Sequence, residues 1–89
     1  MQAVISVVGK DKVGILKDVA TKCAEHNVNI VDVTQKVLKD MFTMIMLVDI
    51  SKIDVKFGDF AEEMETFGLS IGMQIRTMHE DIFNSMHRI

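Results

Sequence analysis

The hydrophobic residues of this 89-residue chain recur at two different spacings, and the order of those spacings restricts the fold more than any other feature. Short β-rich or alternating runs indicate strands, whereas apolar residues three and four positions apart indicate amphipathic helices. The expected elements are a strand at 3–8, a helix between Asp11 and Asn27, strands at 29–38 and 42–50, a helix at 57–67 and a strand at 69–77.

The first helix has residues suited to both of its ends. Asp11 can accept a hydrogen bond from the backbone N–H of Val13 or Gly14. Asn27 can take the left-handed conformation that often ends a helix, and Val28 would then fold back onto it. The core-facing residues of this helix are Ile15, Leu16, Val19, Ala20, Cys23 and Ala24.

The second helix is predicted by an apolar face and by two residues at its ends. Asp54 is the expected N-cap, and Gly68 is placed for the C-terminal cap. The apolar face consists of Phe57, Phe60, Ala61, Met64 and Phe67. The strand that follows should have one solvent-exposed face, because apolar and polar residues alternate from 69 to 77. Its apolar side consists of Leu69, Ile71, Met73 and Ile75.

The connection at Lys39-Asp40-Met41 is so short that the strands at 29–38 and 42–50 must form an antiparallel hairpin. With right-handed crossovers, the βαββαβ order gives an α+β ferredoxin-like sandwich. This fold is a four-stranded antiparallel sheet with two helices on one face. Its first and third strands are central, and the strand at 69–77 lies at an edge.

The two central strands are apolar on both faces, and two helices can cover only one of those faces. In the first strand, for example, Ile5 and Val7 alternate with Val4 and Val8. The uncovered row needs a second subunit or a C-terminal helix to cover it, and we expect a homodimer. The short C-terminal helix is predicted by the capping-box spacing of T-M-H-E at 77–80. An apolar stripe on that helix, ending near His87 and Arg88, consists of Ile82, Phe83, Met86 and Ile89.

The composition excludes several classes of protein. Ten Lys+Arg against thirteen Asp+Glu give a charge of −3, with no Trp or Tyr, so no nucleic-acid binding is expected. The longest apolar run, Met44 to Val48, is far shorter than the roughly 18 residues of a membrane-spanning helix. No secretory leader is recognised, so we expect a cytoplasmic protein without a membrane partner. The chain has no proline or linker, which indicates a single domain at 1–89, with a core at 2–78 and a helical tail at 79–89.

The loop from Gly9 to Gly14 (G-K-D-K-V-G) has the glycine spacing of a phosphate-binding loop but lacks its chemistry. Ile15 and Leu16 stand where Lys and Ser/Thr would bind phosphate and magnesium, so no nucleotide or other cofactor is expected. The loop does open a helix, whose free backbone N–H groups suit a small anion such as a carboxylate. An ordinary tight turn, in which Gly14 allows the helix to pack closely on the sheet, explains the same residues.

Other reactive side chains give no stronger signal. Cys23 and His26 have a spacing that could pair metal ligands, but no second pair accompanies them, so no metal site is expected. The four serines are scattered along the chain, and no histidine approaches them in the predicted fold. No pair of carboxylates is held apart on facing strands either. The sequence therefore predicts that the protein is not an enzyme.

Three motifs in this order resemble ACT domains, the small amino-acid-sensing modules of metabolic enzymes. The motifs are D-K-V-G-I-L at 11–16, N-I-x-D at 29–32 and F-T-M-I-M-L-V-D at 42–49. The resemblance covers residues 2 to about 78. Within the family, the chain is most similar to stand-alone ACT-domain proteins. The tail beyond residue 78 supports this placement. It is next most similar to the ACT domains of formyltetrahydrofolate deformylase and the glycine cleavage repressor.

The resemblance implies a homodimer that holds a small ligand, often an amino acid, between its subunits. The candidate ligand-binding residues, by position, are Asp11 and Gly14 in the first loop and Asn29 on the second strand. Amino-acid-binding members often have Asn where this chain has Asp11. An aspartate accepts hydrogen bonds but cannot donate them, so Asp11 would hold a ligand ammonium, and Asn29 with backbone N–H groups would hold the carboxylate. Alternatively, Asp11 is only the helix cap.

Three functions are therefore considered. The first is a homodimeric regulatory module that binds a small molecule, most simply an amino acid. The second is a ligand-free protein–protein interaction module that docks on a metabolic enzyme or regulator, and the third is an enzyme of unrecognised type. We expect no catalytic or DNA-binding domain beside this 89-residue domain, so regulation would pass through a separate protein partner.

Overall fold

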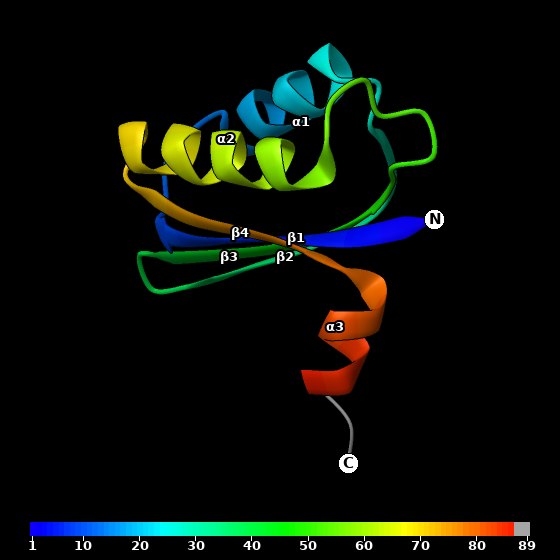
Figure 1. The fold of residues 1–89 in the computed structure, drawn as a ribbon. Helices are drawn as coiled ribbons and strands as arrows, with labels where there is room; N and C mark the ends of the chain where they lie inside the picture. Colours follow the sequence, from blue (N-terminus) through cyan, green and yellow to red (C-terminus); the bar gives the residue numbers. More distant parts are fainter. Residues whose placement is uncertain (87–89) are drawn as a thin grey trace.

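The alternating segments form a four-stranded antiparallel sheet with two helices packed on one face (Figure 1). The computed structural model describes residues 1–86. The elements are β1 (Gln2–Lys10), α1 (Ile15–Glu25), β2 (Asn29–Leu38), β3 (Met41–Asp49), α2 (Phe57–Ser70), β4 (Met73–His79) and α3 (Glu80–Met86). The strand order β2-β3-β1-β4 places β1 and β3 in the centre. The predicted ferredoxin-like βαββαβ fold with a short C-terminal helix is confirmed.

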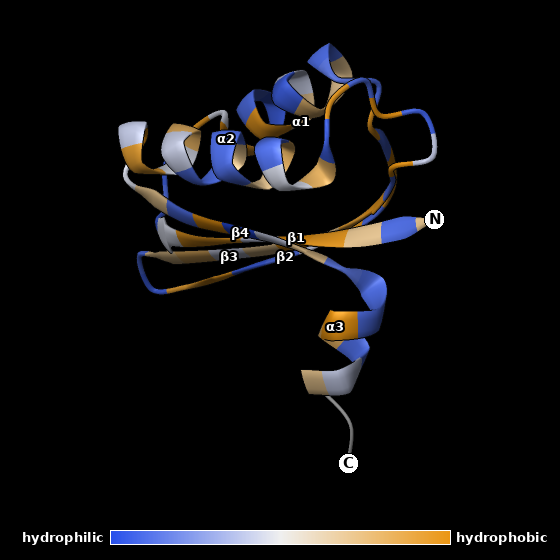
Figure 2. Ribbon diagram, viewed as in Figure 1, coloured by the Kyte–Doolittle hydropathy of each residue, from blue (hydrophilic) through white to orange (hydrophobic). Residues whose placement is uncertain are grey.

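The core lies between the sheet and the two helices. Ile5 and Val7 of β1 and Met44 and Met46 of β3 are fully buried, and Phe60 of α2 packs in the same cluster. In Figure 2, hydrophobic residues follow the strands and alternate with hydrophilic ones in the helices above them. Burial of each such side chain contributes roughly 1.5–3 kcal/mol, so this layer is the main source of stability.

The end of α1 follows the predicted arrangement. Asn27 has a φ of 59°, and its N–H donates to the carbonyl oxygen of Ala24 at 3.2 Å. The N–H of Val28 donates to the carbonyl oxygen of Cys23 at 2.9 Å, and the Val28 side chain is buried. These two bonds form a Schellman motif, which satisfies carbonyl groups that the helix end would leave unpaired.

The hairpin between β2 and β3 closes through Lys39 and Asp40, with Leu38 paired to Met41. Lys39 takes the left-handed conformation, with a φ of 58°. The backbone N–H of Asp11 donates to the carbonyl oxygen of Asp40 at 2.7 Å. This bond holds the loop after β1 against the hairpin.

The predicted boundary between α2 and β4 is wrong. The helix continues through Gly68 and Leu69 to Ser70, and β4 begins only at Met73. The left-handed turn predicted at Gly68 lies at Gly72, which has a φ of 74°. Residues 69–71 alternate like a strand, but Leu69 points into solvent from the last turn of the helix.

Three predicted caps are also wrong. Gly14 and Lys56 occupy the N-cap positions of α1 and α2, and neither helix has a side-chain cap hydrogen bond. Asp11 therefore does not cap α1, and Asp54 bonds to a histidine instead of capping α2. The predicted capping box at 77–80 is absent, because pairing with β1 extends β4 through Thr77 as far as His79.

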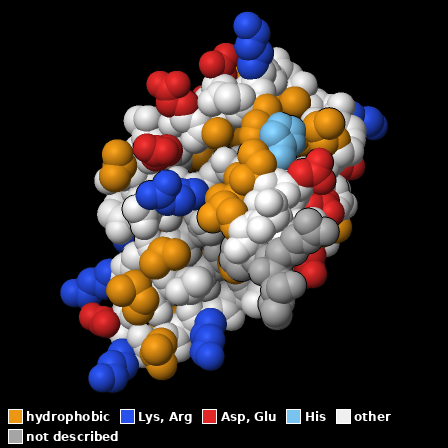
Figure 3. All heavy atoms as spheres, turned by 60° about the horizontal axis from the view of Figure 1, so that its bottom comes forward, with side chains coloured by type: hydrophobic (Ala, Val, Ile, Leu, Met, Phe, Trp, Pro, Cys, Tyr) orange, Lys and Arg blue, Asp and Glu red, His pale blue; other side chains and the backbone are white. Residues whose placement is uncertain are grey.

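The C-terminal helix α3 lies below the sheet, on the face opposite α1 and α2 (Figure 1), and packs against β1 and β4. On this lower face Val4 is 5% exposed, whereas Ile45 is 40% exposed. Figure 3 shows hydrophobic side chains scattered among charged ones on this side. The tail helix thus covers only part of the second apolar row. The predicted contributions of His87, Arg88 and Ile89 lie outside the described residues.

None of the helices within residues 1–86 combines the length and the apolar character needed to cross a membrane.

Helix α2 approaches β4 closely at Gly68. A Cβ there would lie 2.7 Å from Cγ1 of Ile75 and 2.8 Å from the carbonyl oxygen of Met73. Gly68→Ala should therefore lower the free energy of unfolding by about 1–3 kcal/mol, although alanine favours helices. The matched control is Gly58→Ala in the same helix, where a Cβ meets nothing within 4 Å and stability should be kept or raised. Urea unfolding of both variants measures the difference, and equal effects would contradict the close approach.

Candidate functional site

The loop between β1 and α1 carries two of the three predicted site residues at one end of the sheet. Asp11 is exposed and presents its carboxylate without a hydrogen bond to any residue in 1–86. Gly14 ends the loop with a φ of 88°, and a Cβ there would meet nothing within 4 Å. The expectation that Gly14 permits close packing on the sheet is therefore wrong; the position needs glycine for its backbone conformation.

Asn29, the third predicted site residue, lies at the opposite end of the sheet. It begins β2 and pairs with Asp49, which in turn pairs with Gln2 at the start of β1. The loop containing Asp11 follows the other end of β1, a nine-residue strand and so roughly 25 Å away. One chain by itself therefore does not bring Asp11 and Gly14 together with Asn29.

A hollow of about 330 Å³ surrounds Asn29, and its lining is polar. The other lining residues are Asn27, Asp49, Ser51 and Lys52. Within residues 1–86, the side chains of Asn27, Asn29 and Lys52 form no hydrogen bonds. Two amides and an ammonium are thus free to donate to a small anionic group.

Asp49 is held rigidly at the edge of this hollow. Its Oδ1 accepts hydrogen bonds from the backbone N–H of Ser51 at 2.9 Å and from Ser51 Oγ at 2.5 Å. The bonds from Ser51 keep the pKa of the Asp49 carboxyl below its ordinary value. The carboxylate therefore remains charged next to the free donors.

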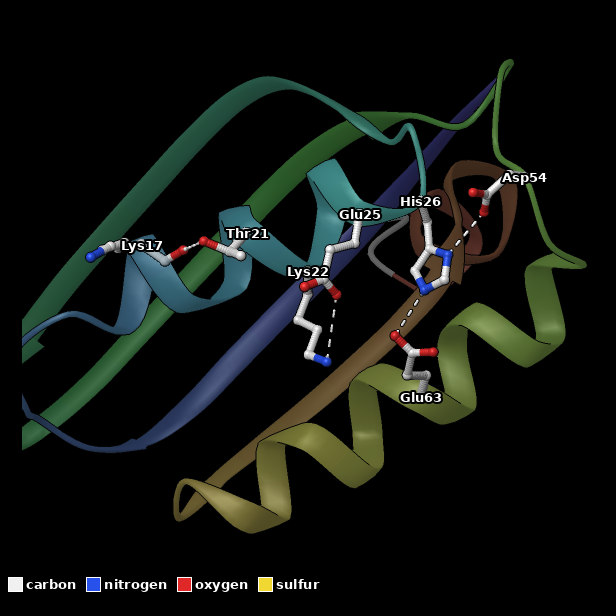
Figure 4. A network of polar contacts seen from close by, with 7 residues as sticks. All are labelled: Lys17, Thr21, Lys22, Glu25, His26, Asp54 and Glu63. Atoms are coloured by element: carbon white, nitrogen blue, oxygen red, sulfur yellow. Dashed lines mark hydrogen bonds and ion pairs between the residues drawn. The ribbon is translucent and has the colours of Figure 1, made fainter.

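A second polar cluster joins the end of α1 to α2 (Figure 4). His26 Nδ1 lies 2.9 Å from Oδ1 of Asp54, and its Nε2 lies 2.8 Å from Oε2 of Glu63. Its ring also contacts the buried Phe60 edge to face. With a carboxylate on each nitrogen, the ring donates on both sides only as imidazolium, and the bonds to Asp54 and Glu63 raise the pKa of His26.

The remaining reactive groups have structural roles. Cys23 is buried in the core, and burial raises the pKa of its thiol to about 11, which leaves it protonated and unreactive. Both ring nitrogens of His26 are engaged by carboxylates, Nδ1 by Asp54 and Nε2 by Glu63. Among residues 1–86, no three His, Cys, Asp or Glu side chains are placed to hold a metal ion.

Sequence reasoning missed the residues that line the hollow with Asn29. Asp49 and Ser51 are two positions apart, a spacing at which an aspartate commonly binds the second following N–H, and this signal was available. The contacts of His26 with Asp54 and Glu63 bridge 28 and 37 residues, and no local spacing reveals them.

Residues 1–78 match the family model of the ACT domain. The chain belongs to the ACT domain family. A UPF0237 protein of Clostridium perfringens is 49% identical over 89 residues and aligns along its whole length with this ACT-domain chain. A UPF0237 protein of Methanococcus maripaludis is 50% identical over 86 residues, which are 97% of this chain and 96% of that protein. The resemblance inferred from the three motifs is confirmed.

Solved structures agree with this assignment. An ACT domain protein from Streptococcus pneumoniae has a TM-score of 0.82 at 40% identity, over 98% of each chain. A formyltetrahydrofolate deformylase from Pseudomonas putida has a TM-score of 0.78 at 10% identity, over 91% of this chain and 30% of that chain. At that identity the second likeness shows the shared fold alone.

The backbone conformation at Gly14 predicts which substitutions are tolerated best there. Gly14→Ala and Gly14→Val should each lower the free energy of unfolding by about 1 kcal/mol or more, because L-residues are strained at positive φ. Gly14→Asn should be tolerated better, since asparagine adopts this conformation more readily and the surroundings are open. If thermal melting showed Asn to be worse than Ala, side-chain size and not φ would control the position.

The His26 cluster predicts that stability falls as pH rises. Because its folded-state pKa lies above the unfolded value, the contribution of His26 is complete below the unfolded pKa and is lost as pH rises through the folded pKa. The free energy of unfolding should decrease from about pH 6 to 8 in the wild type and stay flatter in His26→Gln. Urea unfolding across this range, below the ionisation of the Cys23 thiol, measures both slopes. Equal slopes would show that the cluster does not titrate with folding.

Proposed function

We propose that this ACT domain is a cytoplasmic regulatory module that acts as a homodimer and binds a small molecule, most simply an amino acid, between its subunits. The observation that carries the proposal is the separation of Asp11 and Gly14 from Asn29 by the length of the sheet. Because these residues lie at opposite ends of the sheet, Asn29 of one chain can meet Asp11 and Gly14 of a second chain if the second chain lies antiparallel beside the first.

Strand β2 offers the edge for such pairing. It is the terminal strand of the sheet on one side, and most of its residues are exposed, including Val31, Val37 and Leu38. An exposed edge with apolar side chains favours association with another strand. In an antiparallel pair of β2 strands, the start of one strand lies beside the end of the other.

This pairing assembles the predicted site from two chains. The end of β2 adjoins the first loop, because the N–H of Asp11 is bonded to Asp40 in the hairpin. Asn29 of one subunit would therefore face Asp11 and Gly14 of the other. The Asp11 carboxylate would hold the ammonium of an amino acid, while the Asn29 amide and free N–H groups at the start of α1 would hold its carboxylate.

The dimer and its ligand can be tested together. Sedimentation at micromolar concentration should give twice the 10.0 kDa mass of one chain. In a thermal-shift screen of the twenty amino acids, a ligand at ~100 times its dissociation constant should add ~2.7 kcal/mol of stability. For a domain of this size, that raises the melting temperature by roughly 10–20 °C.

Two substitutions separate ligand binding from folding. Asn29→Ala should abolish the shift and change the ligand-free melting temperature little, because Asn29 is exposed and its amide is unpaired within residues 1–86. Asp11→Asn, which removes only the charge, should weaken binding at constant stability. The matched control is Asp18→Asn on the exposed side of α1, which should bind normally.

A monomer at all concentrations would overturn the shared site. A dimer whose melting temperature no amino acid changes at millimolar concentration would favour the alternative function, a ligand-free module that docks on a metabolic enzyme or regulator.

A further inference from the structure

The second open edge of the sheet is formed by β4, on the side away from β2. An edge strand presents alternate backbone N–H and carbonyl groups that no neighbouring strand satisfies. At this edge, α2 lies over β4 and packs against it closely at Gly68 (Figure 1). The β4 edge is therefore bordered by a helix, an arrangement that can receive an extended segment.

Hollows follow this edge along the length of β4. One of about 500 Å³ extends to Thr77 and Met78, and an adjoining one of about 80 Å³ begins at Met73. Both are lined by Glu65 and Leu69 of α2 and by Arg76 of β4. We call this continuous depression the α2/β4 groove.

Two groups in the groove lack the partners that folded proteins usually give them. Leu69 is 72% exposed. Thr77 Oγ1 is shielded from solvent and has no hydrogen-bond partner within residues 1–86, where it is the one buried side-chain polar atom in that condition. An unpaired buried hydroxyl destabilises a fold by about 1–3 kcal/mol, whereas the exposed Leu69 side chain is available to an apolar side chain of a partner.

The charge of α2 identifies the kind of partner. The helix carries Asp59, Glu62, Glu63 and Glu65 and contains no Lys or Arg. Glu63 is occupied by His26, whereas Glu62 and Glu65 line the groove without a salt bridge in residues 1–86. Together they outweigh the one cation that residues 1–86 place in its lining, Arg76, so the groove has a net negative charge. If two copies paired through β4, two acidic α2 helices would lie next to each other and repel. A basic segment is attracted instead.

We propose that the α2/β4 groove binds an extended segment of another protein, which adds to β4 as a fifth strand. Every second side chain of the segment faces α2. On that face, a hydrophobic residue contacts Leu69, and a Lys or Arg lies near Glu62 and Glu65. The groove lies at the opposite edge from β2, so this docking surface does not depend on the amino-acid site.

The probe is a library of random linear heptapeptides displayed on phage and selected against the full chain. Enriched peptides should share a Lys or Arg two positions from a hydrophobic residue. Titration of a synthetic enriched peptide into ¹⁵N-labelled protein should shift the amide signals of β4 and α2 and leave those of β2 unchanged.

Matched variants test the contacts. Leu69→Asp and the double variant Glu62→Lys with Glu65→Lys should weaken binding of the enriched peptide at least tenfold. The control Asp18→Lys makes a comparable charge change on α1 and should bind as the wild type does. Thr77→Val should melt at a higher temperature and bind the peptide as the wild type does, because the buried hydroxyl is out of reach of the segment.

The proposal is overturned if no peptide is enriched over background, or if enriched peptides shift signals outside β4 and α2. It is also overturned if Leu69→Asp and the Glu62/Glu65 variant, shown by circular dichroism to be folded, bind the peptide as the wild type does.

Discussion

The packing of α1 and α2 onto the two central strands determines where everything else in this small protein lies. The inward side chains of β1 and β3, such as Ile5 and Met46, are completely buried under the helices. A chain of this length buries only about two-thirds of its unfolded surface, so it cannot lose this layer and remain folded. Side chains available to a partner or ligand consequently lie outside this layer, at the ends and edges of the sheet and on the part of its lower face that α3 leaves open.

The fold could be predicted from the sequence because the burial of apolar side chains, its main source of stability, requires apolar residues at regular spacings. Strands that are apolar on both faces had to be central, and Asn27 before Val28 correctly indicated the end of α1. The errors lie where one local pattern fits two structures. Residues 69–71 alternate as in a strand but complete a helix, because the left-handed turn falls at Gly72 and not at Gly68.

The predictions of the helix caps were wrong for a related reason. A side chain such as that of Asp11 or Asp54 can cap a helix only if the backbone enters the helix at the right residue. In α1 the left-handed Gly14 sets that entry point, three residues after Asp11. In α2, Asp54 is drawn to His26 by a contact that bridges 28 residues. Neither effect can be read from the short window in which a cap is recognised.

The candidate site was predicted residue by residue, but its arrangement was not. Asp11, Gly14 and Asn29 follow from the motifs of the ACT domain, yet strand register, which no motif states, places them at opposite ends of the sheet. The polar neighbours of Asn29, such as Asp49 and Lys52, also depend on that register. Local motifs therefore supplied the candidate residues, and long-range pairing decides where in the fold they lie.

The strand order β2-β3-β1-β4 has a consequence for valency. If two chains join through β2, their β4 strands lie at the two outer edges of an eight-stranded sheet, seven strand spacings or roughly 34 Å apart. Such a dimer would hold two identical docking edges at a fixed separation. A partner that carries two copies of the recognised segment would then bind the second copy at a high effective concentration, so a weak single contact would become a durable complex.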